Sequence, residues 1–210
     1  MRAIKAGGPW LSRSRQSAGV VPQGCASKGE TRLHLGCGAN IMEGWLNADL
    51  VQTDSIPPQA LKLVDSIFIM DATQRFPFTD ASFEYIYCED FVEHFSQRDG
   101  LSMFTECYRV LRPGGVWRFS TPCFDRILPG LKLAAGRDAV EFGHWGWGHK
   151  LLYTEAYART VLEAIGFDAI KTCQFGESGH AVLVGIDTRV EQTYLNLILE
   201  ASKPTLKALT

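Results

Sequence analysis

The sequence contains no apolar run that approaches the roughly 18 residues needed to cross a bilayer, so we expect no membrane span. A short apolar segment followed by a small-residue cleavage site is also missing near its start. Basic residues are not in excess, because 21 Lys and Arg stand against 23 Asp and Glu for a net charge of −2. This balance disfavours nucleic acid as a partner.

Cysteine pairs at metal-binding spacing are absent as well. None of the six cysteines forms a C-x-x-C pair, and no Cys/His cluster has the spacing typical of zinc sites. We therefore expect reduced thiols, a reducing compartment and a cytoplasmic protein, and we assign no metal ligands.

The chain of 210 residues is long enough for one domain and short for two. Residues 1–30 are rich in glycine and serine, hold no acid before Glu30 and show no sustained apolar period. We interpret them as a disordered N-terminal extension, with a transit peptide as the alternative. A single domain is expected over residues 31–204, followed by a C-terminal tail at 205–210.

Short apolar segments alternate with helical patterns in the domain. The segments bounded by Gly, Pro or Asp are typical of strands: 31–35, 45–50, 66–70, 83–88, 116–120, 169–175 and 181–186. A 3.6-residue apolar period predicts helices within 91–111 and over 154–165, the latter with Thr154 as N-cap and Gly166 at its C-terminal end. Residues 194–202 favour a helix over a strand. The alternation predicts an α/β fold with a single doubly wound, mostly parallel seven-stranded sheet and an antiparallel last strand.

Ligands of such sheets bind beyond the carboxyl ends of the strands, so the residues just after each strand are the candidates for a site. Gly36 and Gly38 come after the first strand and let backbone approach a ligand closely. Asp49 ends the second strand, where a carboxylate can accept hydrogen bonds from both hydroxyls of a ribose. Taken singly, each feature is equally typical of an ordinary turn or a solvated acid.

The next two strands continue the pattern. Asp71 follows the third strand, where it can accept a hydrogen bond from an exocyclic amine, and Ala72 leaves room for a flat ring. Glu89 and Asp90 follow the fourth strand. Matching chemistry at four strand ends predicts a nucleoside pocket.

The glycine loop does not fit a nicotinamide dinucleotide. The third glycine of that fingerprint is missing, and only eight residues separate Gly38 from Asn47. The first crossover helix must therefore be very short, which argues against a pyrophosphate bound at its N-terminus. A nicotinamide-dependent oxidoreductase is the disfavoured alternative.

Four segments together resemble the class I S-adenosylmethionine-dependent methyltransferases, and more narrowly the type-11 group: Leu33–Asp49, Asp71–Glu89, Val92–His94 and Arg109–Gly115. The G-W-L-N-x-D spacing of Gly44–Asp49 is similar to a bacterial subgroup often linked to polysaccharide genes. The resemblance covers about residues 31–204 and implies a Rossmann-like methyltransferase fold with S-adenosylmethionine as cofactor.

The resemblance also assigns roles to individual residues. It implies that Gly36, Cys37 and Gly38 pass under the methionine part of the cofactor, that Asp49 binds its ribose, and that Asp71 and Ala72 bind its adenine. It places Glu89 near the reacting methyl group. One departure concerns His34, which replaces the acid that often precedes the glycine loop.

The acceptor side is less defined. A hydroxyl or amine acceptor can require a base, for which Glu89, His94, His144 and His149 are candidates. Residues 122–150 form a long connection that we interpret as an acceptor lid, and its aromatics could stack on a sugar or simply pack over the sheet. Tyr153 is expected to face the same cleft.

Two functions are compatible with these residues. The first is a methyltransferase that acts on a small-molecule or glycan acceptor, and the second is a non-catalytic protein of the same fold that serves as a binding or assembly partner. Methylation of nucleic acid is disfavoured because Cys88-Glu89-Asp90 stands where an N-P-P-Y-type run would be expected.

Overall fold

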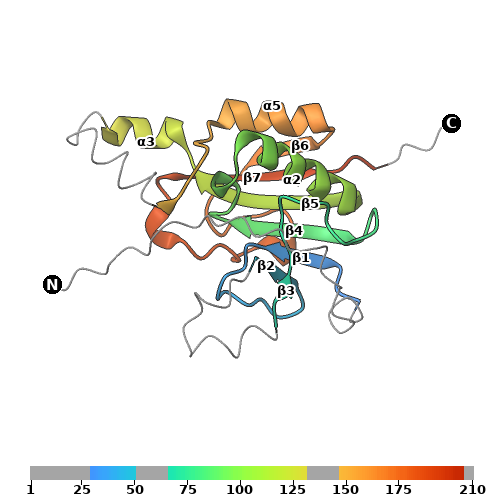
Figure 1. Cartoon of the computed structure of the whole chain (residues 1–210). Helices are drawn as coiled ribbons and strands as arrows, with labels where there is room; N and C mark the ends of the chain where they lie inside the picture. The colour runs from blue at the N-terminus through green and yellow to red at the C-terminus, as the bar shows by residue number, and fades with distance from the viewer. Residues whose placement is uncertain (1–28, 51–65, 132–146, 206–210) are drawn as a thin grey trace.

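The computed structural model describes residues 29–50, 66–131 and 147–205, and it contains a seven-stranded sheet of order β3-β2-β1-β4-β5-β7-β6 (Figure 1). Strands β1 to β5 run parallel to one another, whereas β7 is antiparallel to both β5 and β6. The predicted α/β sheet with an antiparallel last strand is therefore confirmed. The strands are β1 (Arg32–Leu35), β2 (Leu46–Asp49), β3 (Phe68–Ile69), β4 (Phe83–Glu89), β5 (Leu111–Pro122), β6 (Asp168–Thr172) and β7 (Asn196–Ser202).

Three α-helices accompany the sheet in the described ranges: α2 (Gln97–Val110), α3 (Phe124–Leu131) and α5 (Glu155–Ile165). Short 3-10 turns occur at η2 (Val92–His94), η4 (Ala181–Leu183) and η5 (Val190–Gln192). Among these residues no helix combines the length and the apolar character that a membrane crossing demands. The expected N-terminal extension lies almost wholly outside the described part of the chain.

Local signals explain how α2 and α5 begin and end. Ser96 caps α2 by accepting a hydrogen bond from the Asp99 amide at 3.2 Å, which separates this helix from the η2 turn and shortens the predicted 91–111 segment. Thr154 caps α5 in the same way at 3.1 Å, and Gly166 ends it with a φ of 115°. Both caps expected for α5 are confirmed.

Alternate residues of the central strands face two different layers. Ile86 of β4 and Trp117 of β5 point to the layer of α2 and α5, where the rings of Trp117 and Phe104 lie 4.6 Å apart. Tyr87 points to the opposite side, into a smaller cluster with Trp45 and Leu183. Figure 1 shows α2 and α5 together on one side of the sheet.

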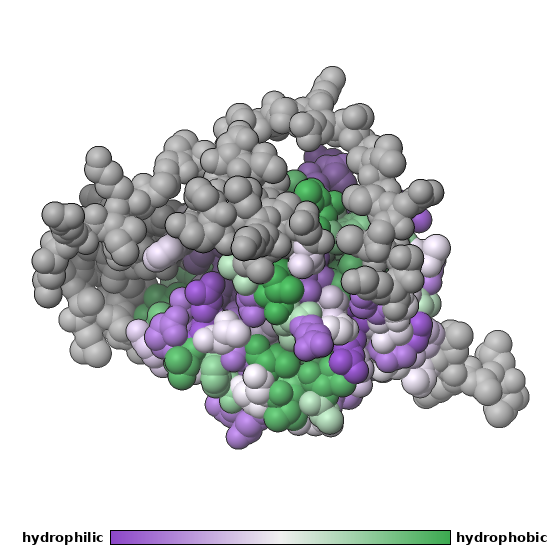
Figure 2. Space-filling model, turned by 90° about the horizontal axis from the view of Figure 1, so that it is seen from below, coloured by the Kyte–Doolittle hydropathy of each residue, from purple (hydrophilic) through white to green (hydrophobic). Residues whose placement is uncertain are grey.

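The second side of β4 and β5 is covered by the β6–β7 connection, residues 173–195. Arg118 of β5 is fully buried there and binds Asp187 and Glu200 through its guanidinium group. It also donates to the carbonyl oxygens of Glu177 and Gln174. Seen from below, the described surface of the molecule mixes hydrophobic and hydrophilic side chains (Figure 2).

Two sequence predictions in this region are wrong. Residues 181–186 form a 3-10 turn and loop rather than the seventh strand. The Tyr87 hydroxyl donates to the Ile186 carbonyl and Arg118 binds the next residue, Asp187, so this segment is held against the face of the sheet. Residues 194–202 contain β7 rather than a helix. The side chains of β7 are buried on both faces, and Glu200 of this strand is the partner of Arg118, so tertiary pairing outweighs local preference.

Candidate active site

The glycine loop lies after β1 at the carboxyl edge of the parallel strands. Gly36 and Gly38 have φ values of +63° and +50°, which residues with a side chain rarely adopt. A Cβ atom on Gly38 would meet no atom of the described residues within 4 Å, so these residues leave the space beside it open. A Cβ atom on Gly36 would lie 2.2 Å from the Phe91 ring, so this ring covers the first glycine.

Asp49 ends β2 beside this loop. Its Oδ2 accepts a hydrogen bond from the Gly38 amide at 2.7 Å, and its Oδ1 accepts one from the Leu50 amide at 2.6 Å. A carboxylate offers about four acceptor positions, so these two bonds orient the group and leave capacity for a ligand. The side chain is half-exposed, as a ligand contact requires.

Asp71 and Ala72 lie after β3 at the same edge. Asp71 Oδ1 accepts two hydrogen bonds, from the amide and the hydroxyl of Thr73. Within the described residues Oδ2 has no such bond, and it can accept from an amine. Ala72 is buried, so the backbone at this strand end lies against the core.

His34 and Asn47 explain how the short connection between β1 and β2 is held. His34 is buried, and its Nδ1 lies 3.1 Å from Asn47 Oδ1. The Asn47 amide group also donates to the carbonyls of Met42 and Trp45, and its oxygen accepts from the Met42 amide. No helix forms in residues 36–45, in agreement with the short crossover that the spacing predicts.

Glu89 is engaged by the β6–β7 connection. Its carboxylate accepts hydrogen bonds from the amide and hydroxyl of Thr188 and from the amide of Arg189. These three donors hold both oxygens toward the connection. The geometry therefore gives Glu89 a positioning role at the end of β4.

Two more of the base candidates, His94 and His149, lie together. They lie beside Glu93, an acid to which the sequence analysis assigns no role. The rings of His94 and His149 meet edge to face with centroids 4.8 Å apart. Glu93 is fully buried, and its Oε1 lies 3.8 Å from His149 Nε2. Burial raises the pKa of Glu93 to about 8 and lowers the pKa of His94. The only sequence signal for Glu93 is its place beside His94 in the V-E-H segment.

The structure describes only part of the expected acceptor lid, and it places Tyr153 in the core. His144 and residues 132–146 of the expected lid lie outside the described residues. Tyr153 does not face a cleft: it is buried, and its ring is parallel to that of Phe104. Trp147 is 68% exposed. The sequence pattern could not separate these two aromatics because both come after glycine-rich segments.

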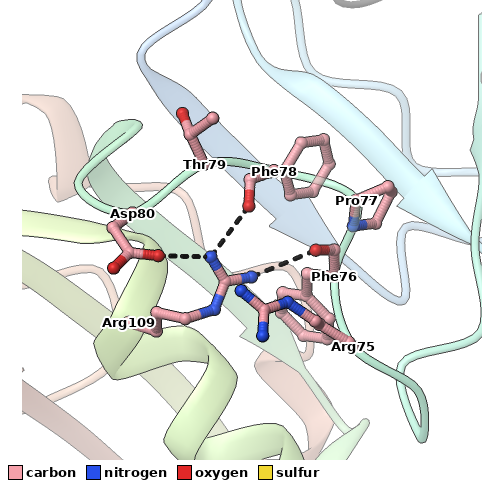
Figure 3. Close-up of a pocket in the computed structure, with 7 residues that line it drawn as sticks. All are labelled: Arg75, Phe76, Pro77, Phe78, Thr79, Asp80 and Arg109. Atoms are coloured by element: carbon pink, nitrogen blue, oxygen red, sulfur yellow. Dashed lines mark hydrogen bonds and ion pairs between the residues drawn. The ribbon is translucent and has the colours of Figure 1, made fainter.

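A pocket of about 510 Å³ lies beside Arg109, away from the carboxyl edge (Figure 3). The Arg109 guanidinium donates to the carbonyls of Phe76 and Phe78 and pairs with Asp80 and Glu106. These bonds join the end of α2 to the segment before β4. The pocket is therefore lined by a structural cluster, and the edge with Asp49 and Asp71 remains the better candidate for chemistry.

Asp90 provides a pH-dependent prediction. Burial raises its pKa to about 6, while a hydrogen bond from Asn196 and the charge of Arg189 oppose the rise and the charges of Glu89 and Glu191 add to it. Between about pH 4 and pH 6 the unfolded chain releases this proton while the folded chain retains it, so Asp90 lowers stability as the pH rises through that window. We expect Asp90→Asn to remove a decline on the order of 1–3 kcal/mol.

Denaturant unfolding of the wild type and Asp90→Asn at pH 4, 5, 6 and 7 measures this difference. Asn tolerates the φ of +48° at this position and keeps an oxygen for Asn196, so the backbone and that bond are preserved. Parallel stability curves for the two proteins would contradict the prediction.

Known proteins similar to this chain include methyltransferases. Residues 33–119 match the family model described as "Methyltransferase domain". A "Probable methyltransferase PMT1" of Arabidopsis thaliana is 32% identical over 102 residues, which cover 44% of this chain. The matched segment spans only 16% of that relative's length.

Solved structures extend the likeness to most of the fold. A "SAM dependent methyltransferase" from Archaeoglobus fulgidus matches with a TM-score of 0.54 and 16% identity, over 82% of this chain and 85% of that one. A phosphoethanolamine N-methyltransferase 2 of Haemonchus contortus, solved with S-adenosyl-L-methionine, matches with a TM-score of 0.53 and 14% identity, over 83% and 48%. At these identities the likeness establishes the fold.

Proposed function

We propose that this chain is a class I S-adenosylmethionine-dependent methyltransferase that transfers the methyl group of that cofactor to a small-molecule or glycan acceptor. Two findings support this: residues 33–119 match a methyltransferase domain model, and the fold matches that of a solved methyltransferase. The observation that carries the proposal is the arrangement of Gly38, Asp49 and Asp71 at the ends of three adjacent parallel strands. The relatives' names support methyl transfer, and the bound ligand of the Haemonchus contortus enzyme supports the cofactor.

The residues present fit a nucleoside cofactor. The open space beside Gly38 admits a ligand close to the backbone, and the half-exposed carboxylate of Asp49 can accept from the ribose hydroxyls. Asp71 Oδ2 would accept from the adenine amine beside Ala72. Gly36 and Cys37 would lie under the methionine part, where the Phe91 ring must move or form part of the wall.

When bound, S-adenosylmethionine supplies a methyl group on a positively charged sulfur, and the protein supplies alignment and a dry site. Glu89 would hold the β6–β7 connection beside the end of β4. His94 is a proposed base, because its lowered pKa keeps the ring neutral and able to accept a proton near pH 7. His149, in ring contact with His94, is the second proposed base.

The acceptor class rests on one exposed aromatic and on sequence resemblance. Trp147 precedes His149 and presents most of its ring to solvent, where it can stack on a sugar. Residues 30–210 are more acidic than the whole chain, because residues 1–29 carry basic charges and no acid, and this disfavours nucleic acid. We place the protein in the cytoplasm because five cysteines of the described region are free thiols.

A non-catalytic assembly partner is the second candidate, and the Phe91 ring favours it. By covering Gly36, this ring occupies part of the surface that a cofactor would contact. A protein of this kind would bind S-adenosylmethionine weakly and release no S-adenosylhomocysteine. Product formation therefore separates the two candidates.

Calorimetric titration of the full chain with S-adenosylhomocysteine tests the proposal. We expect micromolar binding, no binding of NADH, and a loss of at least roughly 30-fold in Asp49→Ala because the ribose contact is removed, at about 2 kcal/mol for hydrogen bonds to a charged group. Asp168→Ala, which removes an exposed carboxylate from β6, is the matched control and should bind as the wild type does. Absence of binding to a folded wild type would overturn the enzyme proposal.

A further inference from the structure

We propose that Glu93, His94 and His149 form a binding site for one divalent transition-metal ion of the zinc type. One donor atom from each residue lies within 4.8 Å of the other two. The proposal concerns a different ligand from the methyl donor, and its test does not depend on methyl transfer. With the ion bound, His94 and His149 are ligands and accept no proton, so the base role proposed above applies to the metal-free protein. Sequence spacing does not reveal it, because two of the ligands are adjacent and the third comes 55 residues later.

The two segments that carry the ligands are joined by backbone hydrogen bonds. The amides of Lys150 and Leu151 both donate to the Glu93 carbonyl, at 2.8 and 3.2 Å. The approach of His149 to the η2 turn is therefore fixed by the backbone rather than by flexible side chains.

The Glu93 carboxylate is oriented as a ligand would be. Its Oε2 accepts a hydrogen bond from the Thr121 hydroxyl at 2.9 Å, which directs Oε1 toward the two histidines. Within the described residues Oε1 is buried and has no hydrogen-bond partner. A buried carboxylate oxygen without a donor is costly, and a cation beside it would remove that cost.

The donor set selects the ion. Two imidazoles and one carboxylate are ligands typical of zinc and neighbouring transition metals, and neutral imidazole is a poor ligand for magnesium or calcium. Ligands about 2.0–2.1 Å from one ion lie roughly 3.4 Å apart, so the donors must close by about an ångström through side-chain rotation. Three protein ligands leave a fourth position for water or an oxygen of a substrate.

Some neighbouring charges favour a cation at this site and others oppose it. The charge of Asp90 acts on Glu93 and favours a cation at the site. The charge of Lys150 acts on His94 and opposes one. The bond from Thr121 to Glu93 is an outer hydrogen bond of the kind that orients metal ligands in proteins.

Titration of the metal-free full chain with ZnCl2, followed by calorimetry, tests the site, and CoCl2 reports its geometry through visible absorption. We expect one ion per chain with submicromolar affinity, and no measurable response to MgCl2. Glu93→Gln and His149→Ala should each weaken zinc binding at least roughly 100-fold, because each removes one of three ligands. Thr121→Val should weaken it roughly tenfold by releasing the carboxylate.

The controls address folding and other ligands. His180→Ala and Cys173→Ser remove a histidine and a partly exposed thiol elsewhere in the chain and should bind zinc as the wild type does. Circular dichroism checks that each variant is folded, and zinc should raise the melting temperature of the wild type but not of His149→Ala. Absence of stoichiometric binding to the wild type, or binding that survives in both Glu93→Gln and His149→Ala, would overturn the proposal.

Discussion

Arg118→Met will destabilise the protein by about 3–5 kcal/mol, since it removes the cation from a buried network and leaves two carboxylates without their partner. Arg118 and Asp187 are almost completely buried, and Glu200 is only 5% exposed. The substitution also removes donors from the carbonyls of Gln174 and Glu177, so it releases the β6–β7 connection from the sheet. Denaturant unfolding monitored by far-UV circular dichroism measures the loss.

Arg112→Met is the matched control on the same strand. Arg112 pairs with Glu84 where both side chains are more than 40% exposed, so its loss should cost less than about 1 kcal/mol. The Arg118→Met/Glu200→Leu/Asp187→Asn variant should regain part of the lost stability, because it removes the stranded charges. Equal effects of Arg118→Met and Arg112→Met would contradict the expectation.

Gly36→Ala will abolish measurable binding of S-adenosylhomocysteine and destabilise the fold by several kcal/mol. A methyl group at this position meets the Phe91 ring at 2.2 Å, and the φ of +63° adds about 1–2 kcal/mol of backbone strain. The ring or the loop must shift, and either movement alters the surface beside Asp49. Calorimetry and denaturant unfolding measure the two losses.

Gly38→Ala separates strain from steric overlap. Gly38 has a similar φ of +50°, but no atom of the described residues lies within 4 Å of the added carbon, so this substitution should cost only the backbone strain of about 1–2 kcal/mol. Removing the ring removes the steric overlap. The loss of stability that Gly36→Ala adds to a Phe91→Ala protein should therefore be as small as the loss caused by Gly38→Ala in the wild type. An effect of Gly36→Ala no larger than that of Gly38→Ala would show that the ring yields freely.

The sequence predicts those elements whose signals are local. The strands near 31–35, 45–50 and 83–88 and the helix from Thr154 to Gly166 are recovered because apolar runs, caps and glycines act over a few residues. The strand-end acids Asp49 and Asp71 meet at one edge because parallel strands align their carboxyl ends.

Elements that depend on distant partners could not be predicted in this way. The strand over residues 196–202 is stabilised by β5 and β6 on its two sides, and its Glu200 has meaning only beside Arg118. Likewise, Glu93 and His149 meet through backbone bonds between the η2 turn and residues 150–151. Neither pairing leaves a periodic signal in the sequence.

The place of β7 has a consequence for biosynthesis. Because this strand lies between β5 and β6, the long β5 strand has only one neighbour until residue 202 has left the ribosome. Until then the backbone N–H and C=O groups on this edge of β5, around Trp117 and Phe119, have no partner strand and can pair with strands of other chains. Prematurely terminated chains that lack the last strand should therefore aggregate, and completion of translation protects the sheet.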